Sequence, residues 1–193
     1  MGVLSFKRGT KSRGMLAGYD PGVFIPIATI TVGSTAQSSV TFTSIPSTYT
    51  HLQIRGIGRF SGNDSYGSMQ FNSVTPGANY YNHRLLGNGS AAVAQSTADS
   101  PARLQMTNNG STANNFAVFI IDILDYTSTN KNKTVRYFSA WDNNGSGLLF
   151  FDSSLWSSTP AAITSIKFDA RVDGGTSDFG QYTQFALYGI KGA

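Results

Sequence analysis

The clearest indication of the fold class is the segment His51-Leu52-Gln53-Ile54-Arg55-Gly56-Ile57-Gly58. Leu52 and Ile54 share one face with Gly56, and Gln53, Arg55 and Ile57 lie on the other. This period of two is typical of a strand with one face toward a core, because successive side chains in a strand point to opposite sides. The sequence therefore predicts a β-strand over residues 51–58.

Similar short segments recur along the chain, separated by turns rich in Gly, Pro, Asn and Asp. We expect further strands within residues 23–32, 40–43, 69–71, 103–107, 116–124, 134–141, 148–151, 163–172 and 179–190. Pro26 places the first of these at a sheet edge or at a strand start. Residues 90–101 are small and polar, and their pattern allows either a short helix or an irregular segment. About ten strands at this spacing predict an all-β, antiparallel β-sandwich, with a jelly roll as the first choice.

Composition supports a sheet protein. The 193 residues contain no Cys and no Glu, and strong helix formers are scarce among the abundant Ser, Thr, Asn, Gly and aromatic residues. A chain of this length is expected to fold as one domain without disulfides or thiolate metal sites. Its most apolar run, residues 116–124, is interrupted by Asp122 and is too short to span a bilayer, so the sequence predicts a soluble protein without a membrane contact.

The charge is concentrated at the N-terminus. Lys7, Arg8, Lys11 and Arg13 are the only charged side chains in the first 18 residues, while the other 10 basic residues balance 10 aspartates. We expect an extended, Gly-rich arm over residues 1–22 and a sandwich domain over residues 23–193. The arm is either a disordered tail or a segment that orders in a partner. In the second case its contacts are Phe6, Lys7, Arg8, Lys11, Arg13 and Leu16. Four positive charges in the arm, without a matching basic patch expected on the sandwich domain, argue against nucleic-acid binding.

Catalytic and metal-binding patterns are weak. His51 and His83 are far apart in sequence and lie among ordinary strand residues, which favours structural roles. Asp122 and Asp125 could pair, but carboxylates at a strand end more often cap a turn. Residues 142–147 resemble a calcium loop only faintly, because Ser153 stands where the loop needs a glutamate. We therefore expect no enzyme activity, no cofactor and no metal.

Carbohydrate binding is the open alternative. Aromatic rings beside Asn- and Asp-rich loops are typical of sugar-binding faces, although large aromatics more often fill a core. The candidates are Tyr66, Tyr80, Tyr81, Trp141 and Trp156. Loops 61–67, 108–115 and 142–147 are where we expect contacts with other molecules, because loops on a rigid scaffold tend to carry recognition.

Three segments resemble a β-sandwich module of tailed-bacteriophage virion proteins. They are Ile45-Pro46-Ser47-Thr48-Tyr49-Thr50-His51-Leu52-Gln53-Ile54-Arg55-Gly56, Ile163-Thr164-Ser165-Ile166-Lys167-Phe168 and Phe185-Ala186-Leu187-Tyr188-Gly189-Ile190-Lys191-Gly192. The likeness covers about residues 24–193, and its motifs have a structural character. The resemblance implies a virion component that is commonly an oligomer.

The expected function is that of a phage structural protein, associated with the tail or a fibre and attached through its arm to other virion proteins. Its location would be the virion, assembled in the bacterial cytoplasm. One alternative is a capsid decoration protein; another is a carbohydrate-binding module that contacts a host glycan during attachment. We expect a homo-oligomer, with a trimer as the first choice.

Overall fold

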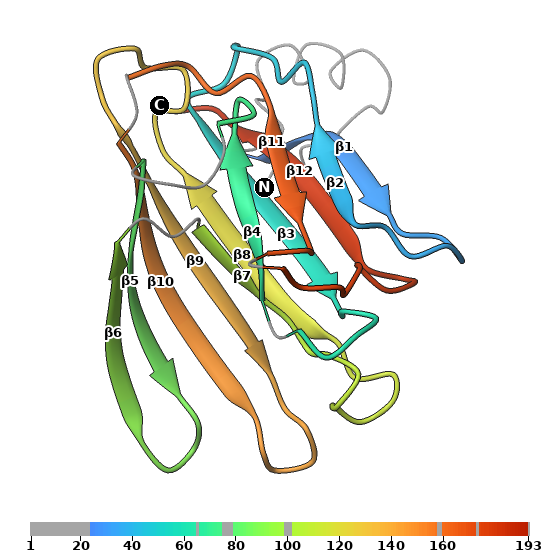
Figure 1. The fold of residues 1–193 in the computed structure, drawn as a ribbon. Coiled ribbons are helices and arrows are strands. Elements are labelled where there is room, and N and C mark those ends of the chain that lie inside the picture. Colours follow the sequence, from blue (N-terminus) through green and yellow to red (C-terminus); the bar gives the residue numbers. More distant parts are fainter. Residues whose placement is uncertain are drawn as a thin grey trace, which may run out of the picture.

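Two antiparallel sheets make up the fold (Figure 1). The computed structural model describes residues 24–64, 66–74, 79–98, 102–157, 160–172 and 174–192. In these residues it contains twelve strands and no helix. The strands are β1 (Phe24–Thr31), β2 (Ser39–Phe42), β3 (His51–Gly58), β4 (Tyr66–Phe71), β5 (Tyr80–Gly87), β6 (Ala92–Ala98), β7 (Ala102–Gln105), β8 (Ala117–Ile123), β9 (Lys133–Trp141), β10 (Leu148–Trp156), β11 (Ile166–Asp169) and β12 (Gln184–Ile190).

The strand order has jelly-roll connectivity. The large sheet runs β1-β12-β3-β8-β9-β10-β5-β6 and the small sheet runs β2-β11-β4-β7. In a jelly roll of eight strands, the first and last are neighbours in one sheet, and the second and seventh are neighbours in the other. Here β2 is the first strand of the roll and lies beside β11, the last. Strand β3 is the second and lies beside the β8-β9-β10 meander, which takes the place of the seventh strand. The predicted sandwich is therefore confirmed, with β1 and β12 added beyond β3.

The stretch that predicted the fold occupies the interior of the large sheet. Strand β3 has the predicted bounds and pairs with β12 on one side and with β8 on the other. Leu52 and Ile54 are fully buried, and Arg55 is exposed. Strand β1 is an edge strand whose register shifts between Pro26 and Ala28, as expected for a strand that carries a proline.

Two of the segments that resemble the phage module lie side by side. Gly189 of β12 is the register partner of Leu52, and the ring of Tyr49 covers Gly189 so closely that an added Cβ would lie 2.3 Å from it. The Thr50 amide donates a hydrogen bond to the Ile190 carbonyl at 2.8 Å. These residues therefore have a packing role, because they join β3 to the last strand.

The core between the sheets is rich in aromatic rings. Phe185 of β12 stacks on Phe168 of β11 with ring centroids 4.7 Å apart, and it also contacts Phe119 and Phe179. Two tyrosine hydroxyls link the layers. The Tyr137 hydroxyl donates to the Gln105 carbonyl at 2.8 Å, and the Tyr80 hydroxyl accepts a hydrogen bond from the Phe71 amide at 3.0 Å. These bonds satisfy polar groups that burial would otherwise leave unpaired.

The buried tyrosines predict loss of stability in alkali. Burial raises the pKa of Tyr80 to about 12 and raises the pKa of Tyr137 as well, both from an ordinary value of 10.0. The neutral phenols therefore stabilise the fold fully below pH 10, and this stabilisation declines as the pH rises from 10 toward 12. Urea titrations at pH 8 to 11 should show a falling free energy of unfolding above pH 10. Over the same pH range the free energy of unfolding should fall less in the Tyr80→Phe variant. An equal fall in both proteins would contradict the role of Tyr80.

One segment differs from the expectations. Residues 92–98 form strand β6, where the sequence allowed a helix or an irregular segment, because pairing with β5 supplies hydrogen bonds that the local pattern does not reveal. Strand β8 lies between β3 and β9 and buries alternate side chains: Phe119 and Ile121 face the core, while Val118 and Ile120 are exposed. The predicted arm, residues 1–22, lies outside the described residues.

Among the residues described, no helix is long and apolar enough to cross a bilayer.

Candidate functional site

The outer side of the large sheet carries a row of exposed apolar side chains. We call this surface the apolar outer face, and its large members are Ile57, Leu85, Val118, Ile120, Phe138, Leu149 and Phe151. Each is between 37% and 52% exposed. Together they expose roughly 600 Å², which is at the upper end of the largest apolar patch on a typical monomer. Patches of this size usually mark interaction surfaces.

Strand register places these residues next to one another. Ile120 of β8 pairs with Phe138 of β9, Phe138 pairs with Phe151 of β10, and Phe151 pairs with Leu85 of β5. One step along the strands, Ile57 pairs with Val118 in the same way. Directly opposed side chains in a sheet lie within contact distance of each other. The apolar outer face is therefore a continuous stripe across five strands, from β3 to β5.

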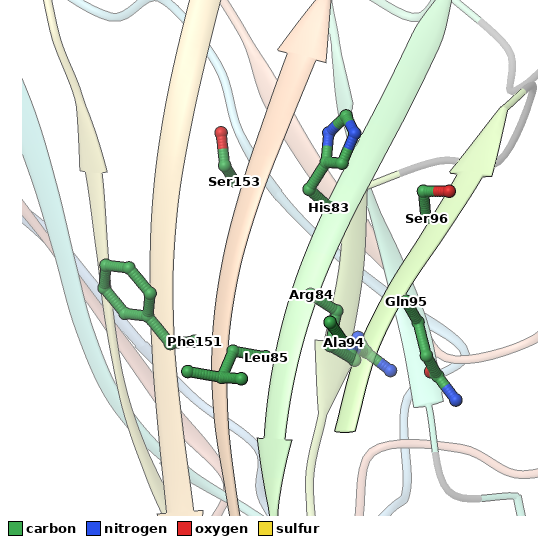
Figure 2. A pocket seen from close by; sticks show the side chains of 8 residues that line it. All are labelled: His83, Arg84, Leu85, Ala94, Gln95, Ser96, Phe151 and Ser153. Atoms are coloured by element: carbon green, nitrogen blue, oxygen red, sulfur yellow. The ribbon is translucent and has the colours of Figure 1, made fainter. Parts of the chain in front are cut away.

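A hollow at the β5 end of the stripe is shown in Figure 2. It has a volume of about 520 Å³. Leu85 and Phe151 lie side by side on one rim, and His83 and Ser153 lie further along the same strands. Ala94 and Ser96 of β6 contribute small side chains, which leave space above β6 on that side of the hollow. Its wall is apolar with a polar end, and it suits a large apolar side chain of a partner.

A polar row borders the stripe. The Arg55 Nε donates to Gln53 Oε1 at 2.6 Å, and the Gln53 amide Nε2 donates to Asp122 Oδ1 at 2.7 Å. The Arg136 guanidinium donates to the other oxygen of Asp122 at 2.8 Å. The guanidinium of Arg55 also lies 4.7 Å from the centroid of the Phe24 ring. The one carboxylate of this row is thus already paired within the sheet.

The apolar outer face was not found from the sequence. Residues 116–124 form one apolar run, which predicts a strand of the sandwich but does not indicate which of its side chains lie outside the core. The available signal was that both alternating sets of β8 are apolar, with Phe119 and Ile121 in one set and Val118 and Ile120 in the other. Such a strand needs cover on both faces, from this chain or from a partner.

The five aromatic candidates for glycan binding do not form one surface. Tyr80 is fully buried and Trp156 is 3% exposed, so both fill the core and are unavailable to a surface ligand. The prediction for these two residues is wrong, because their positions on β5 and β10 face the small sheet. Trp156 packs against Phe71 of that sheet with ring centroids 5.5 Å apart.

The other three aromatic candidates lie apart. Tyr81 is the register partner of Leu155, and Trp141 is the register partner of Leu148, at the opposite end of β10. Seven residues of strand separate the two positions, about 23 Å. Tyr66 is on β4 of the small sheet, under the guanidinium of Arg103. Glycan binding remains a prediction for each of these three residues, but they do not form a common binding surface.

The two histidines lie apart from each other, and so do the two aspartates. His51 Nδ1 accepts a hydrogen bond from the Asp125 amide at 2.9 Å, so it helps to order the turn after β8. Lys131 Nζ lies 2.7 Å from Asp125 Oδ2, and this contact holds the pKa of Asp125 below its usual value. Asp122 instead belongs to the polar row, and His83 lies on the outer side of β5. The structure thus does not pair the two aspartates.

The three loops in which we expected contacts meet at one end of the sandwich. The Asn109 amide donates to the Gly62 carbonyl at 2.8 Å, and the Thr112 amide donates to Asn143 Oδ1 at 2.7 Å. The Arg59 guanidinium donates to the carbonyls of Ser111, Thr112 and Asn115. Many polar groups of these loops therefore bind one another, and the loops form one cross-linked cluster.

The side chain of Asp142, the first residue of the turn at residues 142–147, binds the backbone of that turn. Asp142 Oδ1 accepts a hydrogen bond from the Gly145 amide at 2.8 Å, and Asn144 and Gly145 have positive φ values of 58° and 91°. This is the geometry of a tight polar turn between two strands. In the ranges that the structure describes, no group of three or more His, Cys, Asp or Glu side chains could hold a metal ion.

We compared the chain with protein-family models, with curated proteins and with solved structures, and none of the three comparisons gives a match. The functional assignment therefore depends on the geometry of the sheets and on the resemblance of the segments around Tyr49 and Gly189.

Proposed function

We propose that this chain is a non-enzymatic structural protein of a tailed-phage particle, associated with the tail or a fibre. The observation that carries the proposal is the apolar outer face, a stripe of seven large side chains that the small sheet leaves uncovered. An exposed apolar sheet face costs solubility unless a partner covers it in the working assembly. A building block of a particle has such partners on its surface.

The sandwich supplies a rigid body for this role. A jelly-roll core with rings packed between two sheets presents its outer face in one fixed shape, which reduces the entropy lost on assembly. In this proposal the arm provides a second attachment to the particle through Phe6, Lys7, Arg8, Lys11, Arg13 and Leu16. Two attachments on one chain raise the overall affinity, because the second binding event becomes intramolecular.

Copy number in purified particles tests the proposal and its capsid alternative. Quantitative mass spectrometry against the major capsid protein would measure the ratio of the two chains. A few to a few dozen copies per particle are expected for a tail or fibre component. A ratio near one copy per capsid subunit would instead make the chain a capsid decoration protein, and absence from purified particles would contradict both.

Deletion of residues 1–18 tests the arm. We expect the shortened protein to keep the melting temperature of the full chain, because the described core contains none of these residues, and to lose incorporation into particles. Replacement of Lys7, Arg8, Lys11 and Arg13 by Gln in the full chain separates charge from length. Normal incorporation of the deletion variant would contradict the role of the arm.

A further inference from the structure

We propose that the apolar outer face is an interface between two copies of this chain, related by a two-fold axis that passes near Ala140 of β9. This inference names the partner for the surface on which the proposed function rests. Each copy would lay the outer side of its large sheet on that of the other. The result would be a pair of sandwiches in contact through their eight-stranded sheets.

The size of the surface suits a stable dimer. The seven large side chains expose roughly 600 Å² together, and a standard interface buries about 800 Å² on each partner. Small side chains of the same face, such as Ala94 and Ala140, extend the contact between and beside the large ones. Packing of two sheets face to face is also a common arrangement, with the sheets about 10 Å apart.

The polar groups at this surface allow it to be covered. Asp122 already binds Gln53 and Arg136, and Arg55 already binds Gln53 and lies over the Phe24 ring. The carboxylate of Asp122 would therefore keep its partners inside a contact. Leaving a charge unpaired in an interface is the main cost of covering a polar surface, and the polar row largely avoids it.

The layout of the stripe is self-complementary. It crosses five strands with β9 in the middle, and the polar row runs along one side of it. Under a two-fold rotation about an axis along β9, β8 of one copy faces β10 of the other, so that Ile120 meets Phe151 and Val118 meets Leu149, and the two polar rows lie together at one rim. A contact in which one patch meets itself is the usual form of a two-fold interface. A partner of different composition would not require this symmetry.

The free edge of the large sheet points to the same surface. Strand β6 pairs with β5 alone, and its residues 92–96 are exposed on both faces. Its sequence, AVAQSTA, has no charge and no proline, the features by which natural edge strands avoid unwanted pairing. Ala94 and Ser96 of β6 line the hollow beside Leu85, so a second copy on the apolar outer face would also cover the outer side of this strand.

A single cysteine provides a direct test, because the chain contains none. In the full-length Ala140→Cys variant the two thiols would lie near the two-fold axis, and mild oxidation should convert most of the protein to a disulfide-linked dimer. The matched control is Tyr182→Cys, at a side chain that is 67% exposed and outside the apolar outer face. Equal cross-linking of the two variants, or none in Ala140→Cys, would overturn the inference.

Sedimentation of the full chain over concentrations from about 1 to 100 µM provides the second test. We expect a species of twice 20.6 kDa. The Phe151→Glu variant should weaken association at least about 30-fold, as loss of a central apolar contact does in other interfaces. Tyr182→Glu should associate like the original protein. A monomer at all concentrations, or a trimer that Phe151→Glu leaves intact, would contradict the two-fold contact.

Failure of this inference is distinguishable from failure of the proposed function. A chain that is monomeric in solution but present in particles would overturn the dimer and support the structural role; cross-links from Ala140→Cys to a different virion protein would then identify the true occupant. A dimer that is absent from particles would support the inference and contradict the proposed function.

Discussion

The Gly56→Ala substitution is expected to cost about 3 to 5 kcal/mol of folding free energy or to prevent folding, at the upper end of what single substitutions do. Gly56 lies in β3 directly opposite Phe119 of β8. An added Cβ would lie 2.0 Å from the Phe119 ring and 2.5 Å from the Gln184 carbonyl oxygen. Neither neighbour can move away easily, because Phe119 packs against Phe185 and Gln184 belongs to the paired strand β12.

Urea unfolding of Gly56→Ala beside Gly87→Ala would check this expectation. Gly87 is also a strand glycine of the large sheet, but nothing lies within 4 Å of a Cβ added there. We expect the free energy of unfolding of Gly87→Ala to stay within about 0.5 kcal/mol of that of the original protein. Similar unfolding midpoints for the two variants would show that the close packing of Phe119 on Gly56 is not a constraint on the fold.

The second large effect is expected for Asp152→Ala, at about 3 to 5 kcal/mol, because it removes the buried carboxylate that binds the Arg84 guanidinium. Asp152 of β10 is 2% exposed and Arg84 of β5 is 9% exposed, as side chains. The Arg84 Nη2 lies 2.5 Å from Asp152 Oδ2, and Nε donates to Oδ1 at 2.9 Å. The guanidinium also lies 4.8 Å from the centroid of the Phe150 ring.

Two comparisons isolate the cause of that loss. Asp178→Ala removes the partner of Arg171, whose side chain is 52% exposed, and is expected to cost at most about 1 kcal/mol. Replacing both members of the buried pair, Arg84→Met with Asp152→Leu, should recover most of the stability lost in Asp152→Ala. Equal losses in Asp152→Ala and Asp178→Ala, measured by urea unfolding, would contradict the importance of burial at this pair.

Sequence reasoning succeeded where the pattern is local. The alternation in residues 51–58 predicted β3 to the residue, and Pro26 predicted a sheet edge or a strand start for β1, which is an edge strand. It was less successful for residues 92–98, whose small polar side chains have no period of their own and become a strand only by pairing with β5. Among the site candidates, Tyr80 and Tyr81 are adjacent in the chain, yet one is buried and the other is 39% exposed.

The antiparallel β-sandwich, with its turns at Gly-, Pro- and Asn-rich positions, could be predicted from the sequence, because strand formation and side-chain alternation depend on neighbours along the chain. Which of the two alternating faces is covered is visible only in the packing of the two sheets. The small sheet has four strands and lies on one side of the large sheet, so the opposite side keeps Ile120, Phe138 and Phe151 exposed. Cover of a face depends on contacts between segments far apart in the chain, and no local pattern encodes them.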